Sequence, residues 1–337
     1  MAKIDRQGQG AKFGGKGAMT ASGVTASSSQ KVATPCPAGR LLSGPEQWLL
    51  GLVVALCVSC LINAKLMGQA VDWMAFLPAI GASFALVLMG VYVRVTRQMR
   101  RMALGAIGFG IFASFSSSIA IFIYTLFPLV HPLIDQNLIG YDAAFGFSWV
   151  GFVEFIAGYP ALGIILRYVY LSILPQVVCV IILLSFLNKA DHLHRFLATG
   201  IVCMIVTVGF WWLFPSVGPA AFGMVSPDVQ AKISLIANGA YGAEMRHLAT
   251  QGIDIITPLR ITGVIAFPSF HIVMACMVVW FTRGTWAFLP LVLVNAFMFP
   301  ATVVHGGHHL IDLPGGLIAF AACLWAISRL IPIQKTT

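Results

Sequence analysis

Residues 267–281 read FPSFHIVMACMVVWF, a stretch that starts as a polar turn and continues as an apolar segment. Pro268 disfavours helix at the residue before it, and Ser269 is a residue type that is preferred at helix N-caps. The amides of Phe270 and His271 would then lie in a first helical turn, where unpaired N–H groups and the helix dipole favour an anion. The stretch predicts a membrane helix whose mouth binds an anionic group; the alternative is that Ser269 only caps the helix and His271 points into interfacial water.

The composition around this stretch is typical of a membrane protein. Of 337 residues, 59% are hydrophobic and only 9% are charged, which is more apolar than one water-soluble core of this length requires. A span needs about 20 apolar residues, so we expect an all-α fold, a polytopic membrane helix bundle of about eight transmembrane helices. The apolar runs lie near residues 47–64, 73–95, 103–128, 161–187, 197–215, 270–283, 285–303 and 313–331.

The chain divides into three predicted parts. Residues 1–45 are rich in Gly, Ala, Ser and Lys and lack an apolar block, which predicts a disordered basic tail. Residues 46–130 would hold the N-terminal transmembrane helices, and residues 131–333 a second membrane domain with the polar motifs. The seven cysteines show no spacing that is typical of disulfides or metal sites.

The basic residues indicate which way the chain faces. A net charge of +9 would suggest a nucleic-acid partner for a soluble protein, but here the charges cluster at turns on one side of an eight-span topology. By the positive-inside rule that side is cytoplasmic and carries both termini, and no nucleic-acid partner is expected. The residues on that side are Arg94, Arg97, Arg100, Arg101, Lys189, Arg195, Arg283, Arg329 and Lys335.

A second polar stretch, HGGHHLIDLPGG at residues 305–316, would lie on the same extracytoplasmic face as the first. On a helix His308 and Asp312 share a face, and a carboxylate beside one imidazole nitrogen makes the other nitrogen more nucleophilic. If a helix begins at Asp312, their alignment would instead come from a loop. Two alternatives are a metal site formed by His305, His308, His309 and Asp312, and a purely structural cluster.

Together, "PSFH" and "GGHHLID" resemble the second and third signature motifs of the type 2 phosphatidic acid phosphatase (PAP2) superfamily. The family pattern is P-S-x-H at a helix start and then, after one more helix, a histidine followed by an aspartate four residues on. Pro268, Ser269 and His271 match the former motif, and His308 and Asp312 match the latter.

The resemblance implies a phosphohistidine mechanism and a PAP2-like catalytic domain within residues 131–333. His308 would attack phosphorus, and Asp312 would orient its ring and balance its charge. His271 would protonate the leaving alkoxide and then activate the acceptor.

The same resemblance implies how the phosphoryl oxygens are bound. They would be held by Ser269 and by neighbouring backbone amides such as that of Phe270. No metal or other cofactor is implied, and His309 is expected to matter less than His308.

Two cationic features of the family are not recognised in this chain. One is a first motif of the form K-x6-R-P, and the other is an arginine six residues before the third-motif histidine, where Thr302 stands. His305, Arg167 and Arg260 are the candidates to replace these charges. Arg167 lies in an apolar span and is costly there unless it is paired, faces water or snorkels to the headgroups. An ordinary loop charge is the alternative for Arg260.

Four segments, "FPSFH", "HGGHHLID", "YLSILPQ" and "FPSVGP", are similar to bacterial relatives of inositol phosphorylceramide synthase, the aureobasidin-target branch. That branch transfers a phosphoryl-headgroup from a phospholipid to a lipid alcohol. The resemblance implies an inositolphosphotransferase-like enzyme of membrane lipids in a bacterial inner (plasma) membrane, with a periplasmic site. A lipid phosphate phosphatase acting on a phosphatidate- or prenyl-phosphate-like ester is one alternative, and a catalytically silent lipid-binding or transport protein is another. The sequence indicates no oligomeric state.

Overall fold

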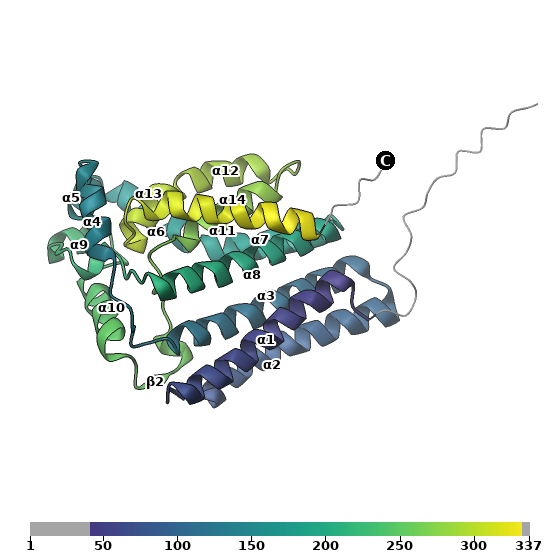
Figure 1. The fold of residues 1–337 in the computed structure, drawn as a ribbon. Helices are drawn as coiled ribbons and strands as arrows, with labels where there is room; N and C mark the ends of the chain where they lie inside the picture. The colour runs from purple at the N-terminus through teal and green to yellow at the C-terminus, as the bar shows by residue number, and fades with distance from the viewer. Residues whose placement is uncertain (1–40, 332–337) are drawn as a thin grey trace, which may run out of the picture. The chain divides into compact units, whose positions relative to one another are not determined.

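A computed structural model describes residues 41–331, and most of the predicted tail, residues 1–45, lies outside the described residues. The described part is helical apart from turns and one pair of two-residue strands, which confirms the all-α expectation (Figure 1). The α-helices are α1 (Gly44–Leu66), α2 (Trp73–Tyr92), α3 (Arg100–Tyr124), α4 (Asp135–Ala144), α5 (Trp149–Ala157), α6 (Pro160–Leu171), α7 (Ile173–Phe186), α8 (Ala190–Leu213), α9 (Pro227–Lys232), α10 (Gly239–Gln251), α11 (Phe270–Phe281), α12 (Phe288–Ala296), α13 (Met298–Gly306) and α14 (Asp312–Leu330). Shorter elements are η1 (Val93–Arg97), η2 (Pro219–Ala221), η3 (Pro258–Arg260), β1 (Ala70–Val71) and β2 (Ile255–Ile256).

Several of these helices are long and apolar enough to cross a bilayer, as expected of a membrane protein. Among the described residues five helices qualify by length and composition, or up to seven if each bent pair of helices counts as one span. One such pair is α12 and α13, which are bent by 42° within the predicted seventh span. The count of eight spans, and the three-part division of the chain, stay predictions.

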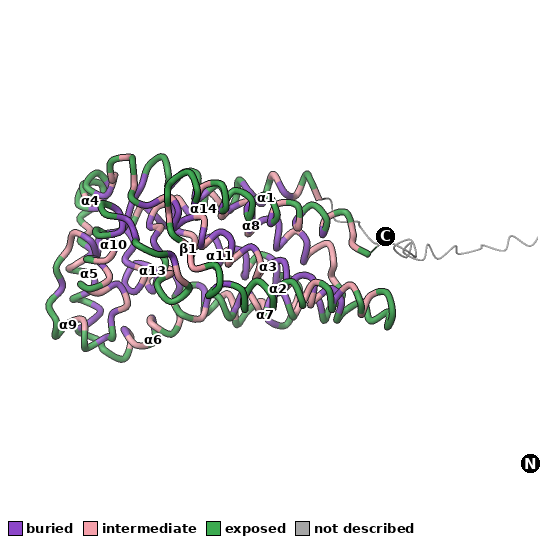
Figure 2. Tube along the Cα trace, turned by 90° about the horizontal axis from the view of Figure 1, so that it is seen from below, coloured by how far each residue is buried: buried purple, intermediate pink, exposed green. Residues whose placement is uncertain are grey.

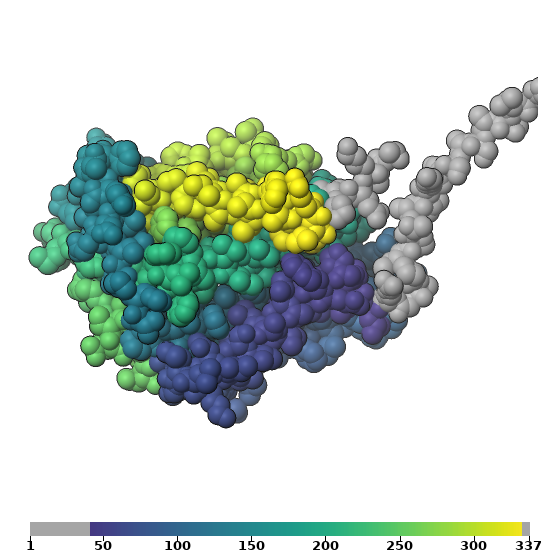
Figure 3. Space-filling view, viewed as in Figure 1, coloured from purple at the N-terminus to yellow at the C-terminus, as the bar shows by residue number. Residues whose placement is uncertain are grey.

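The helices pack in layers. Helices α1 and α2 pack on α3, and α3 packs on α7 and α8. Helix α8 lies between α1 and α14 in the space-filling view (Figure 3). Helix α11 contacts α7, α8, α13 and α14 and is largely buried, whereas α2 exposes most of its residues (Figure 2). Helix α11, which carries the PSFH motif at its start, is therefore an inner helix of the bundle.

The two ends of the bundle differ in content. Helices α4, α5, α9 and α10 gather at one end (Figure 1), where α11 and α14 begin; we call this the histidine end. The opposite end carries the turns with Arg94–Arg101, Lys189 and Arg283, and we call it the arginine end. At the histidine end β1 pairs in parallel with β2, which joins the turn between α1 and α2 to the segment before α11.

Close contact between α2 and α3 depends on two glycines. A Cβ at Gly90 would lie 2.6 Å from Ile107 Cγ1, and a Cβ at Gly110 would lie 2.6 Å from Val87 Cγ2. Small residues at such positions let membrane helices approach each other, and van der Waals contact then stabilises the pair in lipid.

A buried carboxylate ties α1, η1 and α8 together at the arginine end. Glu46 is 1% exposed, and Arg94 donates from Nη1 and Nη2 to its two carboxylate oxygens over 2.7 Å each. The Nε2 atom of His194 lies 3.5 Å from Glu46 Oε1. The fork of an arginine on a carboxylate is the strongest geometry for such a pair.

Replacing Glu46 with alanine is expected to destabilise the bundle by about 2 kcal/mol, because Arg94, which is partly buried, loses two charge-assisted hydrogen bonds. The measurement is the melting temperature of the purified protein in detergent. Glu154→Ala, at an exposed position of α5, is the matched control. Equal melting temperatures for the two variants would contradict a stabilising role of this ion pair.

Candidate active site

The two polar stretches meet at the histidine end through the starts of α11 and α14. The amide of Ser269 donates to the carbonyl oxygen of Asp312 over 3.1 Å. A Cβ at Gly316 would lie 2.5 Å from the carbonyl oxygen of Ser269, and a Cβ at Gly315 would lie 2.7 Å from Phe267 Cε2. The Gly-Gly pair after Pro314 thus allows the first turn of α14 to lie directly against the FPS turn.

His308 and Asp312 form a hydrogen-bonded pair. His308 Nδ1 donates to Asp312 Oδ2 over 3.0 Å, and both side chains are buried. Asp312 is the first residue of α14 and His308 lies in the loop after α13, so the loop and not a helix face aligns them. Because Nδ1 carries the proton, Nε2 is the basic and nucleophilic nitrogen of His308.

His271 faces the same space as His308. The two ring centroids are 6.1 Å apart, with the rings at 70° to each other. Tyr170 of α6 stacks on the His271 ring, with centroids 4.4 Å apart and the rings at 18°. A Cβ at Gly306 would lie 2.8 Å from His308 Cδ2 and 2.9 Å from Tyr170 Cε2, so only glycine leaves both rings in place.

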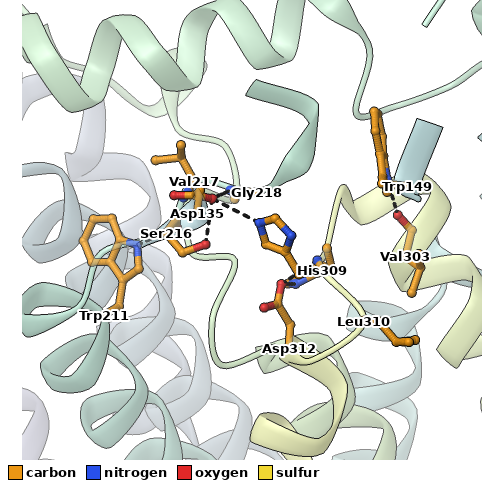
Figure 4. Close-up of polar contacts among 12 residues, drawn as sticks. Asp135, Trp149, Trp211, Ser216, Val217, Gly218, Val303, His309, Leu310 and Asp312 are labelled. Atoms are coloured by element: carbon orange, nitrogen blue, oxygen red, sulfur yellow. Dashed lines mark hydrogen bonds and ion pairs between the residues drawn. The ribbon is translucent and has the colours of Figure 1, made fainter. Parts of the chain in front are cut away.

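His309 is the centre of a buried network that adjoins the His308–Asp312 pair (Figure 4). Its Nε2 lies 3.3 Å from Asp135 Oδ1, and its Nδ1 lies 3.3 Å from Asp142 Oδ2. Its backbone amide donates to Asp312 Oδ2 over 2.9 Å, the oxygen that also accepts from His308. Burial opposes a charge on this imidazole, but hydrogen bonds to Asp135 and Asp142 outweigh it and raise the pKa of His309 to about 9. His309 is therefore an imidazolium at neutral pH.

The aspartate of α4 also fixes the loop after α8. Asp135 accepts hydrogen bonds from Ser216 Oγ at 2.9 Å, from the amide of Val217 at 3.2 Å and from the amide of Gly218 at 2.8 Å (Figure 4). Gly218 has φ of +89°, and a Cβ there would lie 2.3 Å from the carbonyl oxygen of Gly307. The "FPSVGP" segment thus packs against the histidine loop through a backbone contact that only glycine permits.

Two tryptophans brace this region from either side. Trp211 Nε1 donates to the carbonyl oxygen of Ser216 over 2.9 Å, and Trp149 Nε1 donates to that of Val303 over 2.8 Å (Figure 4). Both indoles are buried and have their polar atom satisfied, as buried tryptophans require.

Arg167 and His305 lie on neighbouring helices beside the histidine loop. His305 Nε2 donates to the carbonyl oxygen of Gly163 over 2.9 Å, and Gly163 is one turn before Arg167 on α6. Arg167 Nε is buried without a hydrogen-bond partner among the described residues. Arg167 and Pro175 also have the spacing of the first and last positions of K-x6-R-P, with Leu174 in place of the arginine.

The other predicted phosphate-binding residues have different surroundings. Ser269 is the N-cap residue of α11 but makes no capping bond, and its Oγ is buried without a partner within residues 41–331. Phe270, the first residue of α11, is part of the wall of a cavity beside His271. Arg260 is half exposed and lies 3.6 Å from Glu244 Oε1, and within residues 41–331 no hydrogen bond or ion pair joins it to the histidines. The binding roles of all three residues stay predictions.

The loop histidines do not converge as a metal site would require. His305 binds the Gly163 carbonyl, His308 binds Asp312, and His309 lies between two other carboxylates. In the described part of the chain no group of three or more His, Cys, Asp or Glu side chains is arranged to hold a metal ion.

Sequence reasoning missed Asp135, Asp142 and the central place of His309. The available signal was the spacing in "DQNLIGYD", since residues seven apart lie on one face of a helix. Two carboxylates on one face of a helix in an apolar protein need a cationic partner if they are buried. The neighbouring histidines His308 and His309 offer one.

Replacing His309 with alanine is expected to cost about 3–5 kcal/mol of stability, because Asp135 and Asp142 lose their counter-charge in a buried site.

The raised pKa of His309 also makes the stability of the protein depend on pH. Stability from the imidazolium is fully present below the ordinary histidine pKa of about 6.5 and is lost as pH rises through about 9. Melting temperatures across this range should fall for the wild type and stay flatter for His309→Gln; parallel curves would contradict the assignment.

Most of the residues that form this site lie within a segment that matches a known family. A family model described as the PAP2 superfamily matches residues 136–326, which is more than half of the chain and includes both histidine motifs. No curated protein and no solved structure matches the chain. Helices α1, α2 and α3 precede the matched segment. Given the extent of the family match, this chain belongs to the PAP2 superfamily.

Proposed function

We propose that this protein is an integral-membrane lipid phosphotransferase that moves a phosphoryl-headgroup between lipids through a phosphohistidine on His308. Membership of the PAP2 superfamily supports a lipid phosphatase or phosphotransferase in general. The observation that carries the proposal is the His308–Asp312 pair with His271 opposite it, 6.1 Å between the rings, beside an apolar cavity.

The first half of the proposed reaction forms the phosphohistidine. His308 Nε2 attacks phosphorus while the bond from phosphorus to the leaving lipid oxygen breaks. His271 gives its proton to that oxygen, and Asp312 stabilises the positive charge that develops on His308. The cycle therefore starts with this proton on His271.

The second half releases the group to an acceptor. Neutral His271 takes the proton from a lipid hydroxyl, whose oxygen then attacks phosphorus as the bond to His308 Nε2 breaks. His308 returns to its starting state, and His271 again carries a proton for the next cycle. Atoms and charge balance without a further reactant.

The phosphoryl oxygens need donors. The unpartnered Oγ of Ser269 and the first amides of α11 are suited to this task, because a helix N-terminus favours an anion. Arg167 lies one turn after Gly163, whose carbonyl binds His305, and its buried Nε has no hydrogen-bond partner among the described residues to compete with substrate.

Exclusion of water favours the transferase over the phosphatase. His308 is 2% exposed, and Ser269 and His305 are fully buried. Tyr170, His271 and His305 line a cavity of about 550 Å³ whose deeper walls are apolar. A lipid hydroxyl can arrive from such a cavity, whereas water is disfavoured in it.

We also infer the setting of the enzyme. If the arginine end is cytoplasmic by the positive-inside rule, the histidine end faces the periplasm of a bacterial inner membrane. Donor and acceptor would then be membrane lipids of the outer leaflet.

The decisive experiment incubates purified protein with a panel of phospholipids and lipid phosphates, with and without ceramide or diacylglycerol, and records free phosphate and new lipid products together. A new headgroup-bearing lipid that needs the acceptor is the expected result. His308→Ala should lose at least about 10³-fold in turnover, because no nucleophile remains. Release of phosphate regardless of acceptor would instead identify a lipid phosphatase, and an active His308→Ala variant would refute the mechanism.

Arg167→Ala is expected to raise KM or lower kcat by about 10–100-fold, because a charge-assisted contact to the phosphoryl group is lost. Arg167→Lys should recover part of this loss, since it restores the charge but not the fork. Steady-state kinetics of both variants, at matched melting temperature, make the test. Wild-type kinetics for Arg167→Ala would leave this residue with a role at the lipid headgroups only.

A further inference from the structure

The cavity beside His271 extends far from the histidines into the bundle. It has a volume of about 550 Å³ and lies between α3, α7, α8 and α11, and the segment 261–265 also lines it. This volume is within the range of small-molecule sites, about 300–1,000 Å³. Two histidines, His271 and His305, line only one end of it, next to the His308–Asp312 pair.

Most polar side chains of the cavity lie at that end. The polar residues that line the cavity there are Tyr124, Tyr170, Tyr241, Thr262, His271 and His305. Further from the histidine end the wall is formed by aliphatic, aromatic and methionine side chains, with Ser116 as its one hydroxyl. The described lining carries no Asp, Glu, Lys or Arg. A ligand that fits this wall is polar at one end and apolar along the rest of its length.

The depth of the cavity matches a hydrocarbon chain. Phe112 and Tyr124 both line it and lie twelve positions apart on α3, which at a rise of 1.5 Å per residue is about 18 Å. One lipid leaflet has a hydrocarbon depth of about 15 Å, half of the roughly 30 Å core of a bilayer. A chain that starts at the histidines would therefore end near Phe112.

The wall on the side of α3 lies outside the segment that matches the family, residues 136–326. It is nevertheless firmly attached to the site. Tyr124 Oη accepts from the amide of Thr262 over 2.8 Å, and the β1–β2 pair joins the turn between α1 and α2 to the segment before α11. The cavity is thus completed by a helix that belongs to the N-terminal part of this chain.

We propose that this cavity holds a hydrocarbon chain of the lipid substrate, with its polar end at His271 and His308, and that Phe112, Phe196 and Met277 at its deep end limit the length of the chain. The proposal rests on the proposed function and adds the specificity of the same site. Of the lining residues on α3, α8 and α11, these three are the furthest from the histidine end.

The preference for chain length would come from the space in the cavity and not from the hydrophobicity of the chain. A chain that leaves the bilayer for an apolar cavity was already out of water, so added CH2 groups gain little. A chain longer than the cavity must displace packed side chains, which is costly. We expect the binding affinity to stay level as the chain lengthens up to a limiting length, and to fall for longer chains.

Three variants change the limit in known directions. Phe112→Ala and Met277→Ala, on different helices, remove side chains from the deep end and should allow longer chains. Gly200→Ala should have the opposite effect, because its Cβ would lie 2.8 Å from Met277 Cε and push that flexible side chain within a cavity that Gly200 and Met277 both line. Phe84→Ala, 63% exposed on α2, is the control.

The experiment measures binding separately from turnover. Each variant is made in the full-length His308→Ala background, placed in nanodiscs, and titrated with n-alkyl phosphates of increasing chain length, with melting temperature as the readout. Turnover of matching lipid substrates is recorded with His308 intact. We expect Phe112→Ala and Met277→Ala to bind the first chain beyond the wild-type limit about tenfold more tightly.

The outcomes separate the two proposals. A limit that lengthens in both deep-end variants, shortens in Gly200→Ala and stays fixed in Phe84→Ala supports the chain site, whatever the enzyme does with its substrate. An unchanged limit in every folded variant overturns it and leaves the phosphotransfer untouched. Length-dependent binding without any turnover would refute the proposed function and keep the chain site.

Discussion

A charged imidazole between two buried carboxylates is the interaction on which the rest of the site depends. His309 neutralises part of the charge of Asp135 and Asp142, and backbone amides of the loop after α8 donate to Asp135. Because these groups come from α4, the α8 loop and the α13–α14 loop, their pairing fixes three segments together. His308 immediately precedes His309 in that loop, so the buried position of His309 also fixes the orientation of the nucleophile.

Much of the fold and the central pair were predictable from sequence. Long apolar runs predict helices, and the spacing of four between His308 and Asp312 predicts that they meet. The contact forms in the second of the two arrangements that the sequence allowed, since it comes from a loop that ends at the first residue of α14. Ser269 was expected to cap α11, yet its hydroxyl makes no such bond.

The network around His309 and the cavity could not be predicted from sequence. The first depends on partners far apart in the chain, and the second on telling an enclosed apolar surface from one that faces lipid. His309 and Asp135 are 174 residues apart, and no local pattern pairs them. The walls of the cavity on α3 and the lipid-facing side of α2 are both apolar, because lipid tails and protein interiors make similar demands on a side chain. Only the packing of α3 against α7 and α8 shows which face encloses space.

The short parallel pair of β1 and β2 has a consequence for biosynthesis. Ala70 pairs with Ile255, so the turn between α1 and α2 must wait for a partner that is made much later. At about 5–20 residues per second the delay is on the order of ten seconds or more. During that interval the N-terminal helices can associate with one another in the bilayer but lack this tie to the later part of the chain, so completion of the cavity is a late step in assembly.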